Sequence, residues 1–237
     1  MKSALAALKF LTIANRMDEI GSNPQLIGQG ALYFPLVGFT FGLILASLNH
    51  ALEPYLASEV LAVFLVTALI IMSGAVQLEG TQKTFDRWSA PGTPPSEDHQ
   101  GIGVNGLLIL LLIVIFKVRA VEVVGEARHL SLLLAPVMAR WSLVTFLYGT
   151  LAPADQATRL MAEEIRAWQL FLTTAATLAL AIFLVGRAGL WIAFGLSLFA
   201  ILARNYLERR RGGLTRDHLG PIVELSETAT LIFFASF

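Results

Sequence analysis

The sequence contains no cysteine, and it has few charged residues. Only 14% of its 237 residues are charged, whereas a soluble domain carries about 25%. Without cysteine the chain is not a disulfide-stabilised secreted scaffold, and the low charge with high apolar content excludes a disordered chain. The formal net charge is zero, so a basic surface for nucleic acid is not indicated.

What the sequence has in excess is apolar residues. They make up 56% of the chain, with a mean hydropathy of +0.69, against about 45–50% in a soluble domain. This excess is too large for one soluble core, so the lipid bilayer is the expected solvent. Because lipid cannot satisfy backbone N–H and C=O groups, spanning segments must be helical. We predict an all-α, polytopic membrane helix bundle of about seven transmembrane helices, forming a single domain over residues 1–237.

Seven apolar runs approach the length of about 17–25 residues that a transmembrane helix needs. The third run is short if it ends at Lys117, whose side chain can snorkel or face inward. Residues 1–30 are predicted to be a cytoplasmic segment that begins with an interfacial amphipathic helix. The predicted spans are 31–49, 60–78, 104–118, 131–150, 168–186, 188–204 and 219–237.

Lysine and arginine residues predict the orientation. Most of the 17 basic residues lie in four segments, 1–30, 79–103, 151–167 and 204–216. Seven spans place all four segments on the same side, and basic residues are retained on the cytoplasmic side of a membrane. We therefore expect the N-terminus and these four segments to be cytoplasmic.

The first cluster of charges beside an apolar run is Gln77 to Arg87. Glu79, Lys83 and Asp86 have the spacing i, i+4 and i+7, which places them on one face of a helix. Two carboxylates at a membrane boundary can hold Mg²⁺ bound to a phosphorylated substrate. The alternative is that Glu79 and Lys83 form an ordinary i, i+4 surface pair.

The second cluster starts at Gly212 and continues into the last apolar run. Asp217, Glu224 and Glu227 have the spacing i, i+7 and i+10, again one helical face. A carboxylate inside an apolar helix costs about 2.5–3.5 kcal/mol on insertion scales, so a functional role is favoured over simple pairing with arginines. For Arg140, within the run 131–150, anion binding and an ion pair with Glu224 or Glu227 are both open.

A third motif, Asp98 to Gly106, opens the run 104–118 with alternating glycines. Glycines such as Gly103 allow backbone amides to approach a phosphate at the positive end of a helix. Glycine-rich entries to membrane helices are common, so the motif is only a weak indication of a phosphate site.

The order and spacing of these motifs resemble the cobalamin synthase family, adenosylcobinamide-GDP ribazoletransferase. The family's acidic motif, H-L-D-G-x-A-D-x-x-D-G, is altered here. Gln77, Glu79 and Lys83 stand in place of its histidine and first two aspartates, Asp86 is kept, and Arg87 replaces the closing glycine. Further resemblance is carried by Leu8–Ile13, Tyr33–Gly38, Ala135–Trp141 and Gly212–Glu227.

The resemblance implies a transferase of the last steps of cobalamin biosynthesis, in the inner membrane of a bacterial or archaeal cell. The hydroxyl of α-ribazole, or of its 5′-phosphate, attacks adenosylcobinamide-GDP and GMP is released. The implied catalytic residues are Glu79, Asp86 and Asp217, with Glu79 and Asp86 as Mg²⁺ ligands. The implied substrate or phosphate contacts are Lys83, Arg140, Arg216, Gly103, Glu224 and Glu227.

Three alternatives remain beside this interpretation. Lys83 replaces an acidic ligand by a cation and is expected to weaken Mg²⁺ binding, which suits a relative that binds a similar substrate without turnover. A small-molecule transporter would use Arg140, Glu224 and Glu227 to line its path. A CDP-alcohol phosphotransferase is disfavoured, because its D-G-x-x-A-R signature is absent.

Overall fold

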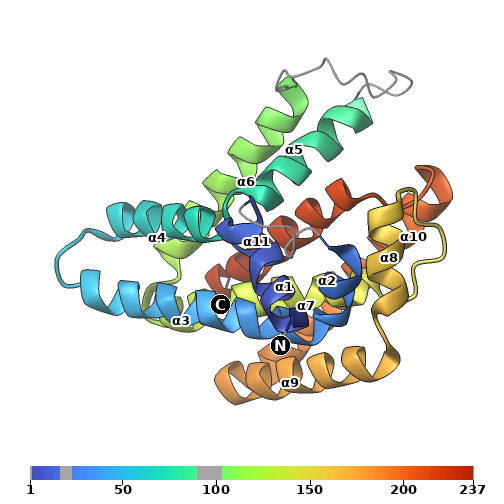
Figure 1. Cartoon of the computed structure of the whole chain (residues 1–237). Coiled ribbons are helices and arrows are strands. Elements are labelled where there is room, and N and C mark those ends of the chain that lie inside the picture. The colour runs from blue at the N-terminus through green and yellow to red at the C-terminus, as the bar shows by residue number, and fades with distance from the viewer. Residues whose placement is uncertain (1, 17–22, 90–102, 237) are drawn as a thin grey trace.

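The computed structural model describes residues 2–16, 23–89 and 103–236, and these ranges are built from helices (Figure 1). They contain no strand, only an isolated bridge between Pro153 and Leu214, so the all-α prediction is confirmed. Short 3-10 turns include η5, Arg216–His218. The α-helices are α1 (Lys2–Leu11), α2 (Pro24–Gln29), α3 (Phe34–Leu52), α4 (Ser58–Ser73), α5 (Val76–Ser89), α6 (Val104–Val123), α7 (Arg128–Leu147), α8 (Gln156–Glu164), α9 (Ala167–Val185), α10 (Arg187–Arg210) and α11 (Leu219–Ala235).

The number of helices able to cross a membrane is five or six in the described ranges, so the predicted count of seven is not confirmed. α4 and α5 make a sixth span only if the bent pair is counted as one. The last predicted span corresponds to α11, whose 17 residues are at the lower limit of about 17–25 for a transmembrane helix, and α11 is not among the candidate spans. The five are Ala31–Leu52, Val104–Val123, Gly125–Leu147, Ala167–Val185 and Arg187–Arg210.

The predicted span 60–78 is not a continuous helix, because the chain bends by 87° between α4 and α5. Gly74 and Ala75 both have positive φ, 65° and 55°, and a left-handed residue ends an α-helix. A side chain at position 74 would also lie 2.6 Å from the Cα of Ile13. The bend directs the charged helix α5 away from α4 and against α6 and α11.

The centre of the bundle is α7, because 83% of its most apolar stretch is buried, against 22–28% of the corresponding stretches in α6, α9 and α10. α3 packs closely along α7 because it presents glycines to it. A Cβ on Gly38 would overlap the backbone of Pro136, and one on Gly42 would overlap Leu133. Small residues allow this close backbone approach in membrane helices. The outer helices expose large apolar side chains, including Phe116, Phe171 and Phe194, as a lipid-facing surface does.

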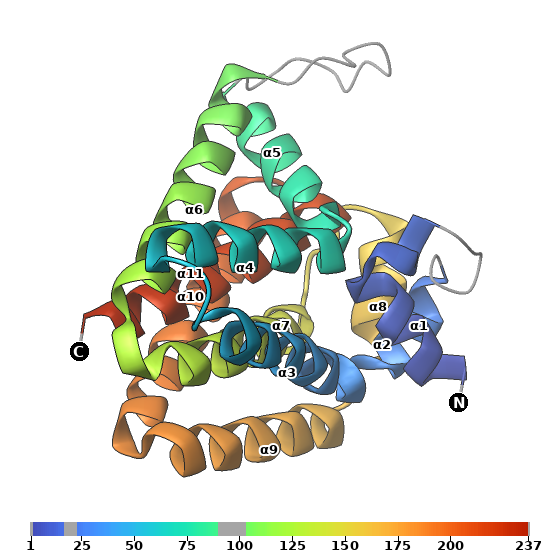
Figure 2. The ribbon, with the colours of Figure 1, turned by 90° about the vertical axis from the view of Figure 1, so that its left-hand side faces the viewer.

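Two groups of helices flank this centre. α1, α2 and α8 gather at one end, while α5 and α6 run side by side away from the bundle (Figure 2). α1 buries Ala6, Ala7 and Phe10, and the Phe10 ring stacks on Phe34 with 6.1 Å between centroids. The start of α11 and the turn η5 before it pack against the charged helix α5.

Candidate active site

α5 and α11 cross at two glycines, and this crossing positions the candidate site. A Cβ on Gly80 would lie 2.8 Å from the carbonyl oxygen of Asp217, and one on Gly220 would overlap the carbonyl oxygen of Gln77. The buried hydroxyl of Thr81 donates back to its own helix, to the Gln77 carbonyl oxygen at 2.7 Å. With no bulky side chain between the helices, the charged face of α5 lies beside the turn that precedes α11.

A cavity of about 260 Å³ opens at this crossing. Four predicted site residues line it: Glu79 and Lys83 from α5, and Arg216 and Asp217 from η5. The remaining wall is mostly apolar and includes Phe10, Leu11, Val76, Leu143, Leu219 and Val223. The structure thus brings together charges that are more than 130 positions apart in the chain.

Both carboxylates of the cavity are paired with cations, and the pairs are exposed to solvent. Lys83 Nζ lies 2.7 Å from Glu79 Oε1, with side chains 50% and 43% exposed. Arg87 lies 3.1 Å from Asp217 Oδ2, with side chains 51% and 29% exposed. The Arg216 guanidinium lies 5.6 Å from the centre of the Phe10 ring. Exposed pairs are worth only about 0.2–1 kcal/mol, so Lys83 and Arg87 can exchange a carboxylate for a ligand at low cost.

The loop that carries Arg216 and Asp217 is held by the loop between α7 and α8. The Leu214 N–H donates to the carbonyl oxygen of Ala152 at 3.0 Å, and the Ala154 N–H donates to the carbonyl oxygen of Leu214 at 2.7 Å. Asp155 Oδ2 accepts the backbone N–H of Arg216 at 2.7 Å and Asp155 also caps α8. Sequence reasoning missed Asp155, although an aspartate before a helix is a usual N-cap signal.

His218 completes this loop and was also missed from the sequence. Its Nδ1 accepts the backbone N–H of Thr215 at 3.0 Å, and its ring lies 6.4 Å from the Trp88 ring on α5. Burial, together with the positive charge of Arg87, lowers the pKa of His218 to about 4. A neutral histidine therefore joins the loop to α5.

Asp86 lies outside the cavity. Its carboxylate accepts hydrogen bonds from the backbone N–H groups of Gly106 at 2.7 Å and Gly103 at 3.0 Å, and from Gln82 at 2.6 Å. The amides expected to meet a phosphate at the start of α6 thus bind this aspartate instead. Residues 98–102 of the glycine motif lie outside the described residues.

Lys117, Arg140, Glu224 and Glu227 form a second group of charges, here termed the buried quartet. Lys117 Nζ lies 2.6 Å from Glu224 and 2.5 Å from Glu227, and Arg140 pairs with Glu227. All four side chains are at most 5% exposed. Lys117 therefore faces inward, and of the two options for Arg140 the ion pair is the one present. The quartet does not line the 260 Å³ cavity.

The predicted Mg²⁺ ligands do not fit a metal site. Glu79 is paired with Lys83, and the Asp86 carboxylate already accepts three hydrogen bonds. Across residues 2–16, 23–89 and 103–236, no three acidic or histidine side chains cluster so as to hold a metal ion. Two cations and two carboxylates line the cavity, so it offers no excess negative charge to a divalent cation.

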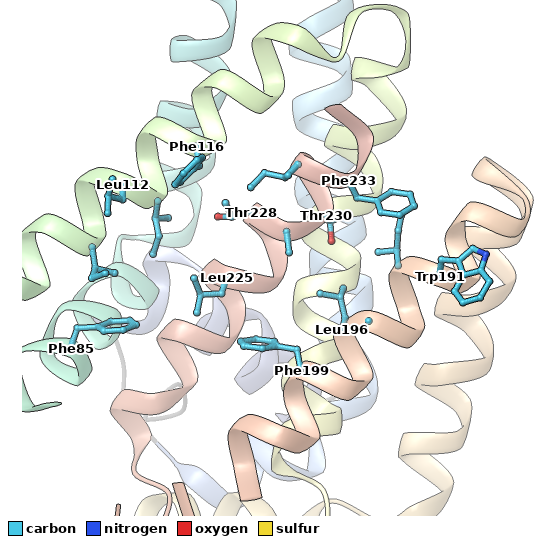
Figure 3. Close-up of a pocket in the computed structure, with 16 residues that line it drawn as sticks. Phe85, Leu112, Phe116, Trp191, Leu196, Phe199, Leu225, Thr228, Thr230 and Phe233 are labelled. Atoms are coloured by element: carbon cyan, nitrogen blue, oxygen red, sulfur yellow. The ribbon is translucent and has the colours of Figure 1, made fainter. Parts of the chain in front are cut away.

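A second cavity, of about 610 Å³, is a different kind of site (Figure 3). Its wall is formed mainly by α6, α10 and α11, and includes Leu112, Phe116, Leu196 and Phe199. No charged side chain lines it, and the Thr228 and Thr230 hydroxyls donate to their own helix. Such a cavity suits hydrocarbon and offers nothing to a phosphate.

Comparison with known proteins covers almost the entire chain. The sequence profile of the family described as cobalamin-5-phosphate synthase matches residues 3–235. This chain is a member of the cobalamin-5-phosphate synthase family. The match includes α5, η5 and α11, so the charged cavity lies in the part of the chain shared with the family. The resemblance drawn from the motifs is confirmed.

The similar proteins share one name. The adenosylcobinamide-GDP ribazoletransferase of Geotalea daltonii is 30% identical over 232 residues, covering 95% of this chain and 94% of that protein. The protein of the same name from Pseudomonas paraeruginosa is 33% identical and covers 99% of this chain and 98% of its own. That from Thermoanaerobacter sp. strain X514 is 27% identical and covers 100% and 98%. No solved structure matches.

Proposed function

We propose that this chain is a membrane transferase that joins α-ribazole, or its 5′-phosphate, to adenosylcobinamide-GDP with release of GMP. The observation that carries the proposal is the meeting of Glu79, Lys83, Arg216 and Asp217 in one cavity. Membership of the cobalamin-5-phosphate synthase family and relatives named adenosylcobinamide-GDP ribazoletransferase supply the substrates.

The cavity suits the pyrophosphate of the substrate. Drug-sized ligands occupy pockets of roughly 300–1,000 Å³, so about 260 Å³ takes the phosphate groups and leaves the corrinoid ring outside. In phosphoryl transfer the protein mainly positions the reactants and neutralises developing charge. Lys83 and Arg216 line the cavity, so we assign them to the phosphate oxygens.

The reaction needs one proton acceptor. A hydroxyl oxygen of the ribazole attacks the phosphorus linked to cobinamide, a new P–O bond forms, and the P–O bond to GMP breaks. GMP leaves with the electron pair of that bond. We assign the hydroxyl proton to Asp217, because it is the less exposed of the two cavity carboxylates and a positioned base contributes about 10²–10⁴-fold to such a step.

Predicted site residues outside the cavity receive positioning roles in this proposal. Asp86 binds the backbone amides of Gly103 and Gly106 and so joins α5 to the start of α6. The buried quartet holds α11 against α6 and α7 through Glu224 and Glu227. The mechanism assigns no step to Mg²⁺, since the ligand set does not fit one.

We further propose that residues 1–237 form one membrane domain whose cavity opens to the cytoplasm, in the inner membrane of a bacterial or archaeal cell. Arg211 supports this orientation, because its guanidinium lies 5.3 Å from the Trp88 ring on the cavity helix α5. Arg211 belongs to the run Arg209-Arg210-Arg211, and such basic runs are retained in the cytoplasm. The nucleotide substrates are on that side.

The test is release of GMP by the purified protein in proteoliposomes, given adenosylcobinamide-GDP and α-ribazole. We expect GMP and the joined product in equal amounts, and loss of both in Asp217→Asn, which removes the assigned proton acceptor. The matched control is Glu163→Gln, since Glu163 is also a carboxylate paired with an arginine, Arg159 at 2.8 Å. Folded protein that releases no GMP would contradict the proposal.

The two alternatives give different results in the same vesicles. A relative without turnover would bind adenosylcobinamide-GDP and release no GMP, in the parent as in Asp217→Asn. A transporter would move substrate across the vesicle membrane with no change in its covalent structure. Its proposed path residues, Arg140, Glu224 and Glu227, line neither of the two cavities described above.

A further inference from the structure

The cavity helix α5 carries cations where a metal-dependent site needs acids. Glu79, Lys83 and Arg87 follow at intervals of four residues and so form one stripe of the helix. Lys83 and Arg87 also occupy positions at which the acidic motif described above has an aspartate and a glycine. With Arg216, three cations face two carboxylates, Glu79 and Asp217.

The retained aspartate, Asp86, is not available to replace the acid missing at position 83. Both oxygens of Asp86 accept backbone N–H groups from the start of α6, at 2.7 and 3.0 Å. A Cβ on Gly103 or Gly106 would overlap or crowd this carboxylate. Turning Asp86 towards the cavity would leave those amides without their partner, which is costly for a helix start.

The three cations have the chemistry that a pyrophosphate requires. A guanidinium binds two phosphate oxygens at once, whereas an ammonium acts as a point charge. Lys83 and Arg87 are about half exposed, so both can turn from their carboxylates to a ligand. The Arg216 backbone is fixed by Asp155 at 2.7 Å, which holds the third cation at the cavity.

We propose that Lys83, Arg87 and Arg216 bind the substrate pyrophosphate directly and neutralise its charge without a divalent cation. The inference rests on the proposed function and deepens it, because it names which groups stabilise the leaving GMP. GMP then departs while its phosphate is held by these three cations, and the attacking hydroxyl still gives its proton to Asp217.

The test combines binding with turnover. Binding of GDP to the purified protein is measured by calorimetry in excess EDTA and again in Mg²⁺, and GMP release is measured in both buffers. We expect GDP to bind in EDTA, GMP release to persist in EDTA, and Lys83→Met to weaken GDP binding by about tenfold, as loss of one charge-assisted contact does. The matched control is Arg159→Met, which removes the cation of an exposed i, i+4 pair on α8 and should leave GDP binding unchanged.

A second variant tests the substitution itself. Lys83→Asp/Arg87→Gly restores the acidic pattern, so we expect it to bind GDP only when Mg²⁺ is present. GDP binding or GMP release that requires Mg²⁺ in the parent chain would overturn the inference and leave the proposed function intact. If no GMP is released in either buffer, the proposed function fails, and GDP binding in EDTA alone decides the inference.

Discussion

The cavity charges and the buried quartet differ in what surrounds them, although one C-terminal segment contributes to both. Asp217 in η5 is 29% exposed and pairs with Arg87. Ten positions later, Glu227 in α11 is 2% exposed and pairs with Lys117 and Arg140. Separating the exposed Asp217–Arg87 pair costs little free energy. Removing one partner of a buried pair, in contrast, costs about 3–5 kcal/mol of stability.

This difference indicates that the cavity charges take part in the reaction, whereas the buried quartet stabilises the helix packing. A charge that binds substrate must give up its partner in each turnover, and the exposed cavity pairs allow this. The quartet is balanced, with two buried cations and two buried carboxylates from three helices. Variants of each group should therefore fail in different ways.

The largest expected effect comes from unbalancing the quartet. Lys117→Met leaves Glu224 and Glu227 with Arg140 alone, so we expect a loss of about 3–5 kcal/mol, or a fall of about 10 °C in apparent Tm. The measurement is thermal unfolding of the protein in detergent. Lys117→Met/Glu224→Gln removes one charge of each sign and should recover much of the loss, and a double variant no more stable than the single one would contradict a balanced cluster.

A smaller effect is expected at the helix crossing below the cavity. A methyl group in Gly220→Ala would overlap the carbonyl oxygen of Gln77, and such overpacking costs about 1–3 kcal/mol. We expect GMP release to fall with stability, because α5 and η5 move apart. Gly195→Ala on α10 meets nothing within 4 Å and serves as the control. Equal behaviour of the two variants would show that the crossing does not position the site.

How much of this arrangement the sequence predicts depends on the residue. The all-α class follows from the apolar content. The i, i+4 spacing of Glu79 and Lys83 also predicts, as one of two interpretations, the ion pair that the structure contains. Periodicity also placed Asp217 with Glu224 and Glu79 with Asp86, and there the structure differs. A 3-10 turn at Arg216–His218 separates Asp217 from the helix of Glu224, and the amides of Gly103 and Gly106 draw Asp86 to α6.

The bend between α4 and α5 was also beyond the sequence pattern. The run through positions 72–78 is mostly apolar and continues the hydrophobic stretch, so composition predicts one helix. The bend depends on Ala75 taking a left-handed conformation, which L-residues with a side chain rarely do, and on the close contact of Gly74 with Ile13. Both features depend on the tertiary structure, which the local sequence pattern does not show.

The smallest expected effect is a pH dependence at the cavity loop. Folded His218 stays neutral down to a pKa of about 4, whereas an unfolded histidine takes up its proton near 6.5. The unfolded state therefore binds more protons between these values, and stability should fall as the pH drops from 6.5 to 4. His218→Asn should remove a slope of a few degrees per pH unit from this part of the Tm profile. An unchanged slope would contradict a buried neutral histidine.

One comparison tests most directly whether the cavity charges act in the reaction and the buried quartet in stability. GMP release per folded protein and apparent Tm are both measured for Asp217→Asn and for Glu227→Gln. We expect Asp217→Asn to lose about 10²-fold or more in GMP release at a nearly unchanged Tm. We expect Glu227→Gln to lower the Tm by several degrees, while the protein that remains folded keeps its GMP release within about tenfold. Loss of GMP release at an unchanged Tm in Glu227→Gln would contradict the account.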